Sequence, residues 1–227
     1  MMRKIIGKII ETILPRPAAE TASKQAEEAP KTELKTISLE QLLGGDAPKE
    51  PDLRVIGLYS SVEDEKIAEL TQALLYLNEM NRLLPEDKEK KPVEFYINTY
   101  GGSADDMFAM YDVMQTVMEE TEIHTIGVGK VMSAGTLLLA AGTKGKRKIG
   151  KNCRVMIHNV AAGNFGTLPN LANELEAIQT LQEDYIAAMV ENTKFTRKKL
   201  EKLLNEKVNI YLSAEEAVRY GLADEIM

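Results

Sequence analysis

From Arg54 onward, strand-like runs alternate with longer segments of helical periodicity, and this alternation constrains the fold more than any other feature. Residues 54–59 and 93–98 are apolar runs of strand length, and each is followed by turn-forming residues. Between these runs, apolar residues recur at the three- and four-residue spacing of one helix face. Strands and helices that alternate in this way pack as a mostly parallel sheet covered by helices. The sequence therefore predicts an α/β domain.

The same pattern continues to the end of the chain. We expect strands at residues 54–59, 93–98, 123–128, 154–158 and 208–212, and helices at 63–84, 104–119, 133–142, 169–192 and 196–204. The methionines of the second helix are interpreted as core residues and not as ligands. Thr196 can cap the fifth helix, and a sixth begins at Ser213, which forms a capping box with Glu216. Gly221 ends this last helix.

Residues 1–50 differ in composition from the rest of the chain. Residues 1–14 place isoleucines on one helical face beside arginine and lysine, which fits a membrane-surface helix, a docking peptide or a removable propeptide. Residues 15–51 are rich in Ala, Glu, Lys and Pro, as flexible linkers are. We therefore expect a flexible tail or propeptide at residues 1–50 and one folded domain at 52–227.

Composition narrows the classes of function. A net charge of −7 argues against nucleic acid as a partner, and the basic cluster at 144–148 is expected to be a solvated turn. Cys153 is the single cysteine, so no internal disulfide is possible, which fits a cytoplasmic protein. No apolar run is long enough to predict a transmembrane helix. No metal-ligand spacing of His or Cys is present either, so we expect no cofactor.

Ser133 lies where the strand-like run 123–128 gives way to a helix rich in alanine and leucine. Free N–H groups at a helix N-terminus favour a developing oxyanion, so this junction suits a nucleophile. Of the two histidines, His158 ends a strand-like run, whereas His124 begins one after several glutamates. The Ala134 amide and one amide of the Gly101–Gly102 turn could hold the oxyanion. A core histidine and a plain β-to-α turn are the alternative interpretations of these residues.

Several longer motifs resemble the ClpP family, the serine peptidase subunits of ATP-dependent barrel proteases. They are RVIGL at 54–58 with VED at 62–64, YINTYGG at 96–102, YDVMQ at 111–115, MSAGTLLLAAGTKGKR at 132–147, NCRVMIH at 152–158 and YLSAEEAVRYGLAD at 211–224. Their order and spacing are close to those of the family. The resemblance implies a crotonase-like fold of repeated β-β-α units with a protruding handle helix.

The resemblance also implies roles for individual residues. By position, Ser133 matches the family nucleophile and His158 its base, and Gly102 and Ala134 match the oxyanion donors. Residues 160–164 match a segment that pairs with the substrate as an added strand. The expected substrate-binding residues are Val160, Ala161 and Ala162.

Partners follow from the same resemblance. The helix at 169–192 is similar to the handle through which two heptameric rings stack into a tetradecamer. Family members degrade unfolded polypeptides that a hexameric AAA+ unfoldase delivers. The N-terminal segment that forms the axial gate in the family is not recognisable before Arg54, so the docking ATPase is left open.

The chain departs from the family at the third member of the triad. Asn209 stands where the family has an aspartate. An amide can hold the imidazole but cannot stabilise imidazolium by charge, and in the Ser-His-Asp template this exchange lowers turnover about 10⁴-fold. Two residues are inserted between His158 and Ser213 relative to the family, so Glu206 is a second candidate. Ser133 is also followed by Ala-Gly instead of the usual Met, which leaves an amide donor in place.

Three functions therefore fit the sequence. The first is an active ClpP-like serine endopeptidase with Asn209 as an altered orienting residue. The second is a catalytically weak or inactive ClpR-type ring subunit that assembles with an active ClpP. The third is an acyl-CoA enzyme of the crotonase fold, in which two backbone amides hold a thioester oxyanion.

Overall fold

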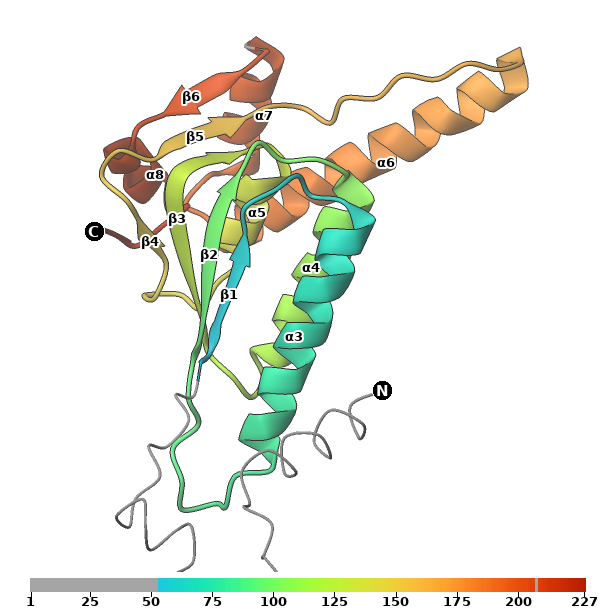
Figure 1. Ribbon diagram of the computed structural model, residues 1–227. Coiled ribbons are helices and arrows are strands. Elements are labelled where there is room, and N and C mark those ends of the chain that lie inside the picture. Colours follow the sequence, from blue (N-terminus) through green and yellow to red (C-terminus); the bar gives the residue numbers. More distant parts are fainter. Residues whose placement is uncertain (1–52, 207) are drawn as a thin grey trace, which may run out of the picture. The chain divides into compact units, whose positions relative to one another are not determined.

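A computed structural model of the protein describes residues 53–206 and 208–227 (Figure 1). In these residues seven strands form one sheet in the order β1-β2-β3-β4-β7, with β5 beside β3 and β6 beside β5. Every pair of neighbouring strands is parallel except β5 and β6. The predicted mostly parallel sheet is therefore confirmed. The expected tail at 1–50 lies outside the described residues.

The strands are β1 (Val55–Leu58), β2 (Val93–Thr99), β3 (Ile123–Met132), β4 (Lys148–Ile149), β5 (Arg154–Ile157), β6 (Ile210–Leu212) and β7 (Glu225–Ile226). The helices are α3 (Asp64–Arg82), α4 (Ala104–Val117), α5 (Ala134–Ala140), α6 (Leu168–Asn192), α7 (Arg197–Glu206) and α8 (Ala214–Tyr220). The sequence missed β4 and β7. Each has two residues, too few to show a period of two, and only pairing with a neighbour defines it.

The strand β3 runs four residues beyond its expected end at 128. Gly129 takes a left-handed conformation with φ 66°, and beyond it Lys130, Val131 and Met132 pair with β5. The register with β2 shifts over the same stretch. Along its edge away from β2, β3 therefore pairs first with β4 and then with β5, and the bend carries the end of the strand toward β5.

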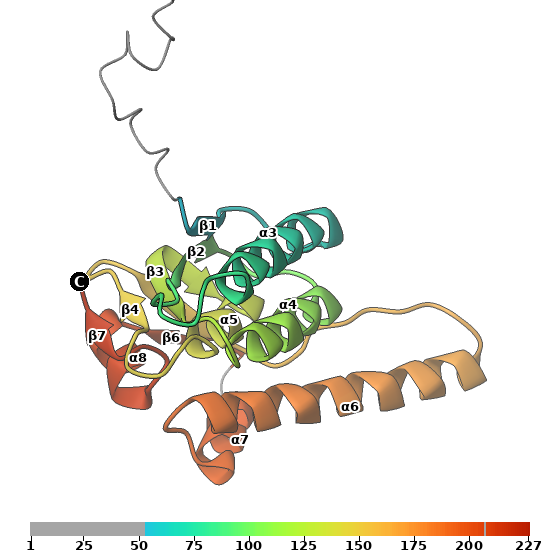
Figure 2. The ribbon, with the colours of Figure 1, turned by 90° about the horizontal axis from the view of Figure 1, so that it is seen from below.

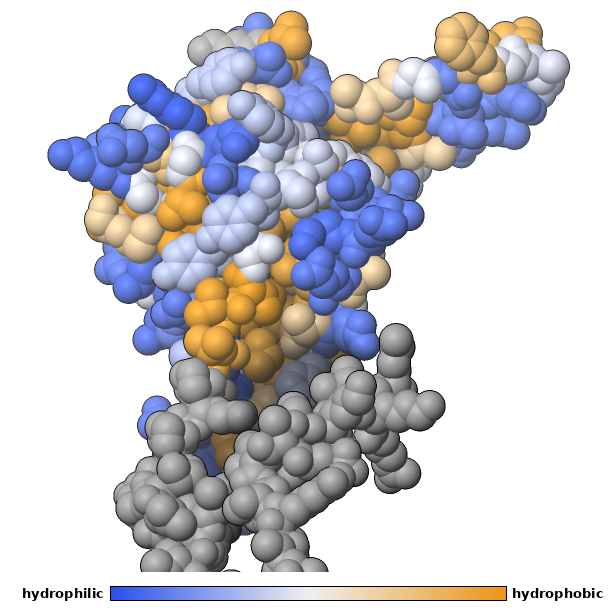
Figure 3. All heavy atoms as spheres, viewed as in Figure 1, coloured by the Kyte–Doolittle hydropathy of each residue, from blue (hydrophilic) through white to orange (hydrophobic). Residues whose placement is uncertain are grey.

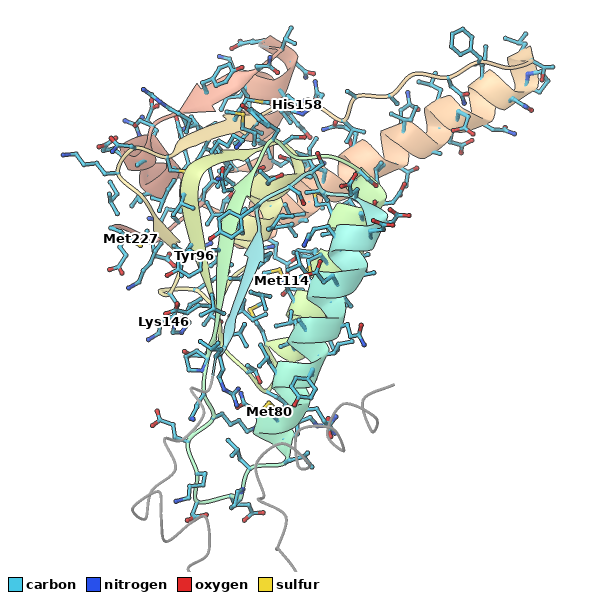
Figure 4. The ribbon with its side chains drawn as sticks, in the orientation of Figure 1. Met80, Tyr96, Met114, Lys146, His158 and Met227 are labelled. Carbon is cyan, nitrogen blue, oxygen red and sulfur yellow. The ribbon has the colours of Figure 1, made fainter. Side chains whose placement is uncertain are left out.

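Helices α3, α4 and α5 lie on one side of β1, β2 and β3 (Figures 1 and 2). The expected methionine face of α4 is confirmed, because Met107, Met110 and Met114 are fully or almost fully buried. In α3, Met80 follows the helical spacing of the buried Leu77 but is 36% exposed. It lies near the far end of α3, whereas Met114 lies beside the sheet (Figure 4).

The long helix α6 projects from the body (Figures 1 and 2). Its second half is packed, with Tyr185 and Met189 buried, but Leu171 and Leu175 are 38% and 56% exposed. Both leucines share the helical spacing of Tyr185, but only the second half of α6 is packed against the rest of the domain. No described helix is long and apolar enough to span a bilayer.

The basic cluster at 144–148 is not wholly solvated as expected. Arg147 is 4% exposed, and its Nη2 and Nε donate to the two carboxylate oxygens of Asp224 at 2.6 and 2.9 Å. Its Nη1 donates to the carbonyls of Ala140 and Asn192 at 2.8 and 2.7 Å. Arg147 therefore joins the ends of α5 and α6 to the C-terminal segment, because a buried guanidinium needs acceptors for its donors.

Candidate active site

Ser133 sits between β3 and α5 in a strained backbone conformation. Its φ of 53° and ψ of −124° make it the only non-glycine residue of the described chain with a positive φ. Its N–H donates to the Met156 carbonyl at 2.8 Å, and its carbonyl accepts from the Thr136 N–H and hydroxyl at 2.9 and 2.6 Å. Such a conformation costs on the order of 1–3 kcal/mol and persists only where its surroundings hold it. Other hydrolases present a nucleophilic serine on a strained strand-to-helix turn of this kind.

The turn after β2 approaches Ser133 so closely that it requires glycine. A Cβ on Gly101 would lie 2.5 Å from Ser133 Cβ, and Gly101 has a φ of 99°. A Cβ on Gly102 would lie 2.1 Å from the Val62 carbonyl oxygen. Val62 holds this turn, since its N–H donates to Gly101 and its carbonyl accepts from the Ser103 N–H. The glycines therefore allow two backbone segments to meet beside the serine.

Two backbone N–H groups beside Ser133 have no acceptor. Neither the Gly102 nor the Ala134 N–H donates a hydrogen bond within residues 53–206 and 208–227. Ala134 is the first residue of α5, where a helix leaves its N–H groups unpaired. Both residues line the cavity that contains Ser133. Free donors at such a place can bind an oxyanion.

His158 is brought to Ser133 by the pairing of β5 with β3. Met156 pairs with Met132, so the residues just beyond them, His158 and Ser133, meet at one end of the sheet. His158 lies just beyond the end of β5 (Figure 4). Its Nε2 lies 2.7 Å from Ser133 Oγ, and the residue is partly buried. A hydroxyl and an imidazole at this distance can exchange a proton. His124, by contrast, lies at the start of β3 and contacts Glu122 at 2.8 Å.

Asn209 does not reach the histidine. Its side chain is exposed, and no hydrogen bond within the described chain joins it to His158. The second ring nitrogen of His158, Nδ1, also has no hydrogen-bond partner among those residues. The structure thus brings together two of the three residues that the sequence put forward as a triad.

The cavity around Ser133 has a volume of about 190 Å³. Val160 and Ala161, but not Ala162, line it together with Ser133 and His158. The Val160 N–H donates to Gln182 Oε1 of α6 at 2.7 Å, which fixes the start of the segment after β5. Mixed polar and apolar walls of this kind suit a peptide backbone with a side chain.

The sequence did not single out Thr136 and Tyr185, which contact each other beside Ser133. Thr136 Oγ1 lies 3.1 Å from the hydroxyl of Tyr185, which is buried and lines the cavity. Burial raises the pKa of Tyr185 to about 12, so it stays a neutral hydrogen-bonding phenol at pH 7. No spacing in the sequence links these residues, because α6 reaches α5 only through tertiary packing.

Comparison with known proteins gives the family. The profile of the Clp protease family matches residues 51–227. This chain belongs to the Clp protease family. The ATP-dependent Clp protease proteolytic subunit of Deinococcus radiodurans is 33% identical to it over 174 residues, which cover 77% of this chain and 80% of that relative.

Membership of the Clp protease family confirms the fold that the resemblance implied. The parallel sheet with its helices is the ClpP/crotonase-like α/β fold. The match also favours a peptidase over an acyl-CoA enzyme of the same fold.

Among the described residues, no group of three or more His, Cys, Asp or Glu side chains could hold a metal ion.

Proposed function

We propose that this chain is a serine endopeptidase subunit of a ClpP-like barrel protease. Ser133 is the nucleophile, His158 is its general base, and the N–H groups of Gly102 and Ala134 form the oxyanion hole. The observation that carries the proposal is the 2.7 Å contact between His158 Nε2 and the hydroxyl of the strained Ser133. Without a catalytic purpose, a positive φ at this serine is a cost to stability.

The proposed reaction begins with an extended peptide paired to residues 160–162. Ser133 Oγ attacks the scissile carbonyl carbon while its proton passes to His158 Nε2. The two free N–H groups hold the negative oxygen of the tetrahedral intermediate. His158 then gives its proton to the leaving amine, and the acyl-enzyme is hydrolysed by a water that His158 activates in the same way.

We further propose that the chain works in rings and receives unfolded polypeptides from a partner ATPase in the cytoplasm. In support, its Deinococcus relative bears the name of a proteolytic subunit of an ATP-dependent protease. Exposed apolar surface supports assembly. It covers the projecting α6, where Leu168 and Leu175 are 81% and 56% exposed, and the start of β1, where Leu53 and Val55 are 74% and 52% exposed (Figure 3). A monomer in water rarely leaves such patches uncovered.

A ClpR-type ring subunit without effective catalysis is the second candidate. The exposed position of Asn209, with no hydrogen bond to His158, favours it. In that case the chain would contribute its surfaces to a ring that also contains an active ClpP.

Labelling of the full-length assembled protein with a fluorophosphonate tests the proposal. We expect covalent labelling that Ser133→Ala abolishes, together with loss of peptide hydrolysis. Ser61→Ala, a change at an exposed serine, is the matched control and should leave both unchanged. If the wild-type protein is neither labelled nor active, and Asn209→Asp creates activity, the ring-subunit alternative is correct.

A further inference from the structure

Within residues 53–206 and 208–227, Nδ1 of His158 has no hydrogen-bond partner, and a serine peptidase needs one there. When Ser133 gives up its proton, the imidazole becomes positively charged, and a carboxylate at Nδ1 stabilises that charge and fixes the tautomer. Asn209 can supply no such charge. A carboxylate for His158, if there is one, must therefore come from another residue.

A second cavity is lined by both His158 and a residue that carries a carboxylate. His158 also lines a cavity of about 420 Å³, and the last turn of α7 forms its other wall. Glu206 is the only acidic residue among the described residues that line it, and Asn209 does not line it.

The end of α7 is held against the segment that follows His158. Asn159 Nδ2 donates to the Leu204 carbonyl at 3.2 Å, which anchors the helix two residues before Glu206. Glu206 is the last residue of α7, where the negative end of the helix dipole disfavours a carboxylate. Its ion pair with Lys202, at 3.7 Å, is between side chains that are 56% and 70% exposed, and exposed pairs contribute little. Neither helix stability nor this pair accounts for a glutamate here.

We propose that Glu206 takes the place of the missing triad acid and acts as the positioning residue for His158. Its carboxylate accepts a hydrogen bond from Nδ1–H of His158 and stays ionised throughout. The proton of Ser133 Oγ moves to Nε2 and from there to the leaving amine, so Glu206 gains and loses no proton. This inference rests on the proposed serine peptidase activity.

The first test compares Glu206→Gln with Glu206→Asp in the full-length assembled protein. Glu206→Gln should lower kcat for peptide hydrolysis and the rate of fluorophosphonate labelling by at least about 10²-fold, toward the roughly 10⁴-fold loss seen when a triad acid becomes an amide. KM should stay within about twofold, because Glu206 does not touch substrate. Glu206→Asp should recover part of kcat, since it keeps the charge. Glu201→Gln, on the same helix and paired with Arg197, is the matched control and should change neither.

The second test does not depend on the folding of those variants. With Glu206 in place, Asn209→Asp should change kcat and the rate of labelling by less than about threefold, because residue 209 does not line the cavity beside His158. The inference is overturned if Asn209→Asp alone raises kcat by about 10²-fold or more. It is also overturned if Glu206→Gln has the wild-type kcat and the wild-type rate of fluorophosphonate labelling. Loss of activity in Ser133→Ala together with a silent Glu206→Gln would leave the peptidase proposal standing and remove only Glu206.

Discussion

Replacing Gly101 by alanine should damage the site more than the fold. The new Cβ would lie 2.5 Å from Ser133 Cβ and 2.9 Å from the Met132 carbonyl oxygen. Because ordinary contact begins at 3.4 Å, Ser133 must shift by about 0.9 Å, or the glycine turn must yield by the same amount. Either movement separates the hydroxyl from His158 or from the N–H of Gly102.

The energetic cost has two parts. A φ of 99° disfavours any residue with a Cβ, by about 1–2 kcal/mol. Overpacking against Ser133 adds about 1–3 kcal/mol. We therefore expect Gly101→Ala to lower the free energy of unfolding by about 2–5 kcal/mol. A displacement near 1 Å in an active site can cost about 10²-fold in rate, and labelling of Ser133 should fall by at least that factor.

Gly145→Ala is the matched control, because Gly145 has a φ of 84° but nothing within 4 Å of its would-be Cβ. It should show the backbone cost alone, about 1–2 kcal/mol, with labelling unchanged. Urea denaturation and fluorophosphonate labelling of both variants measure the two effects. The reasoning is refuted if Gly101→Ala costs no more than Gly145→Ala and labels at the wild-type rate.

Three further outcomes follow from the same structure. Ser133→Gly should be more stable than Ser133→Ala by about 1 kcal/mol in urea denaturation, because glycine relieves the positive φ, although both lose labelling. Ser213→Ala should cost about 1 kcal/mol in the same assay, because it removes the capping box with Glu216 that begins α8. Asp224→Asn should lower stability at pH 7. Burial raises the pKa of Asp224, but hydrogen bonds from Arg147 outweigh it and hold that pKa below the ordinary 3.8. Its contribution is therefore full above 3.8 and is lost as the pH falls through the lower folded value, so the gap between Asp224→Asn and wild type should close in denaturation at low pH.

Local signals predicted α4, α8 and the Ser133 junction well. Only a few neighbouring residues specify each of three features that the structure confirms. They are the methionine face of α4, the capping box at Ser213 and the left-handed Gly221. The exposure of the first half of α6 could not be predicted from the sequence. A helical period shows which residues share a face, but it does not show whether anything in the same chain covers that face.

The sequence by itself determined the order of the five longer strands and of the helices, the mostly parallel sheet and the family, because periodicity, turn residues and motifs are local properties of the chain. It also put forward Ser133 and His158, each at the end of a strand-like run. Only the tertiary structure decided what surrounds them. The bend of β3 after Gly129 and its pairing with β5 set the 2.7 Å contact. Packing of α7 brought Glu206, and not Asn209, to the cavity beside His158. Contacts between residues so far apart in the chain depend on how whole elements pack, and no spacing along the sequence specifies them.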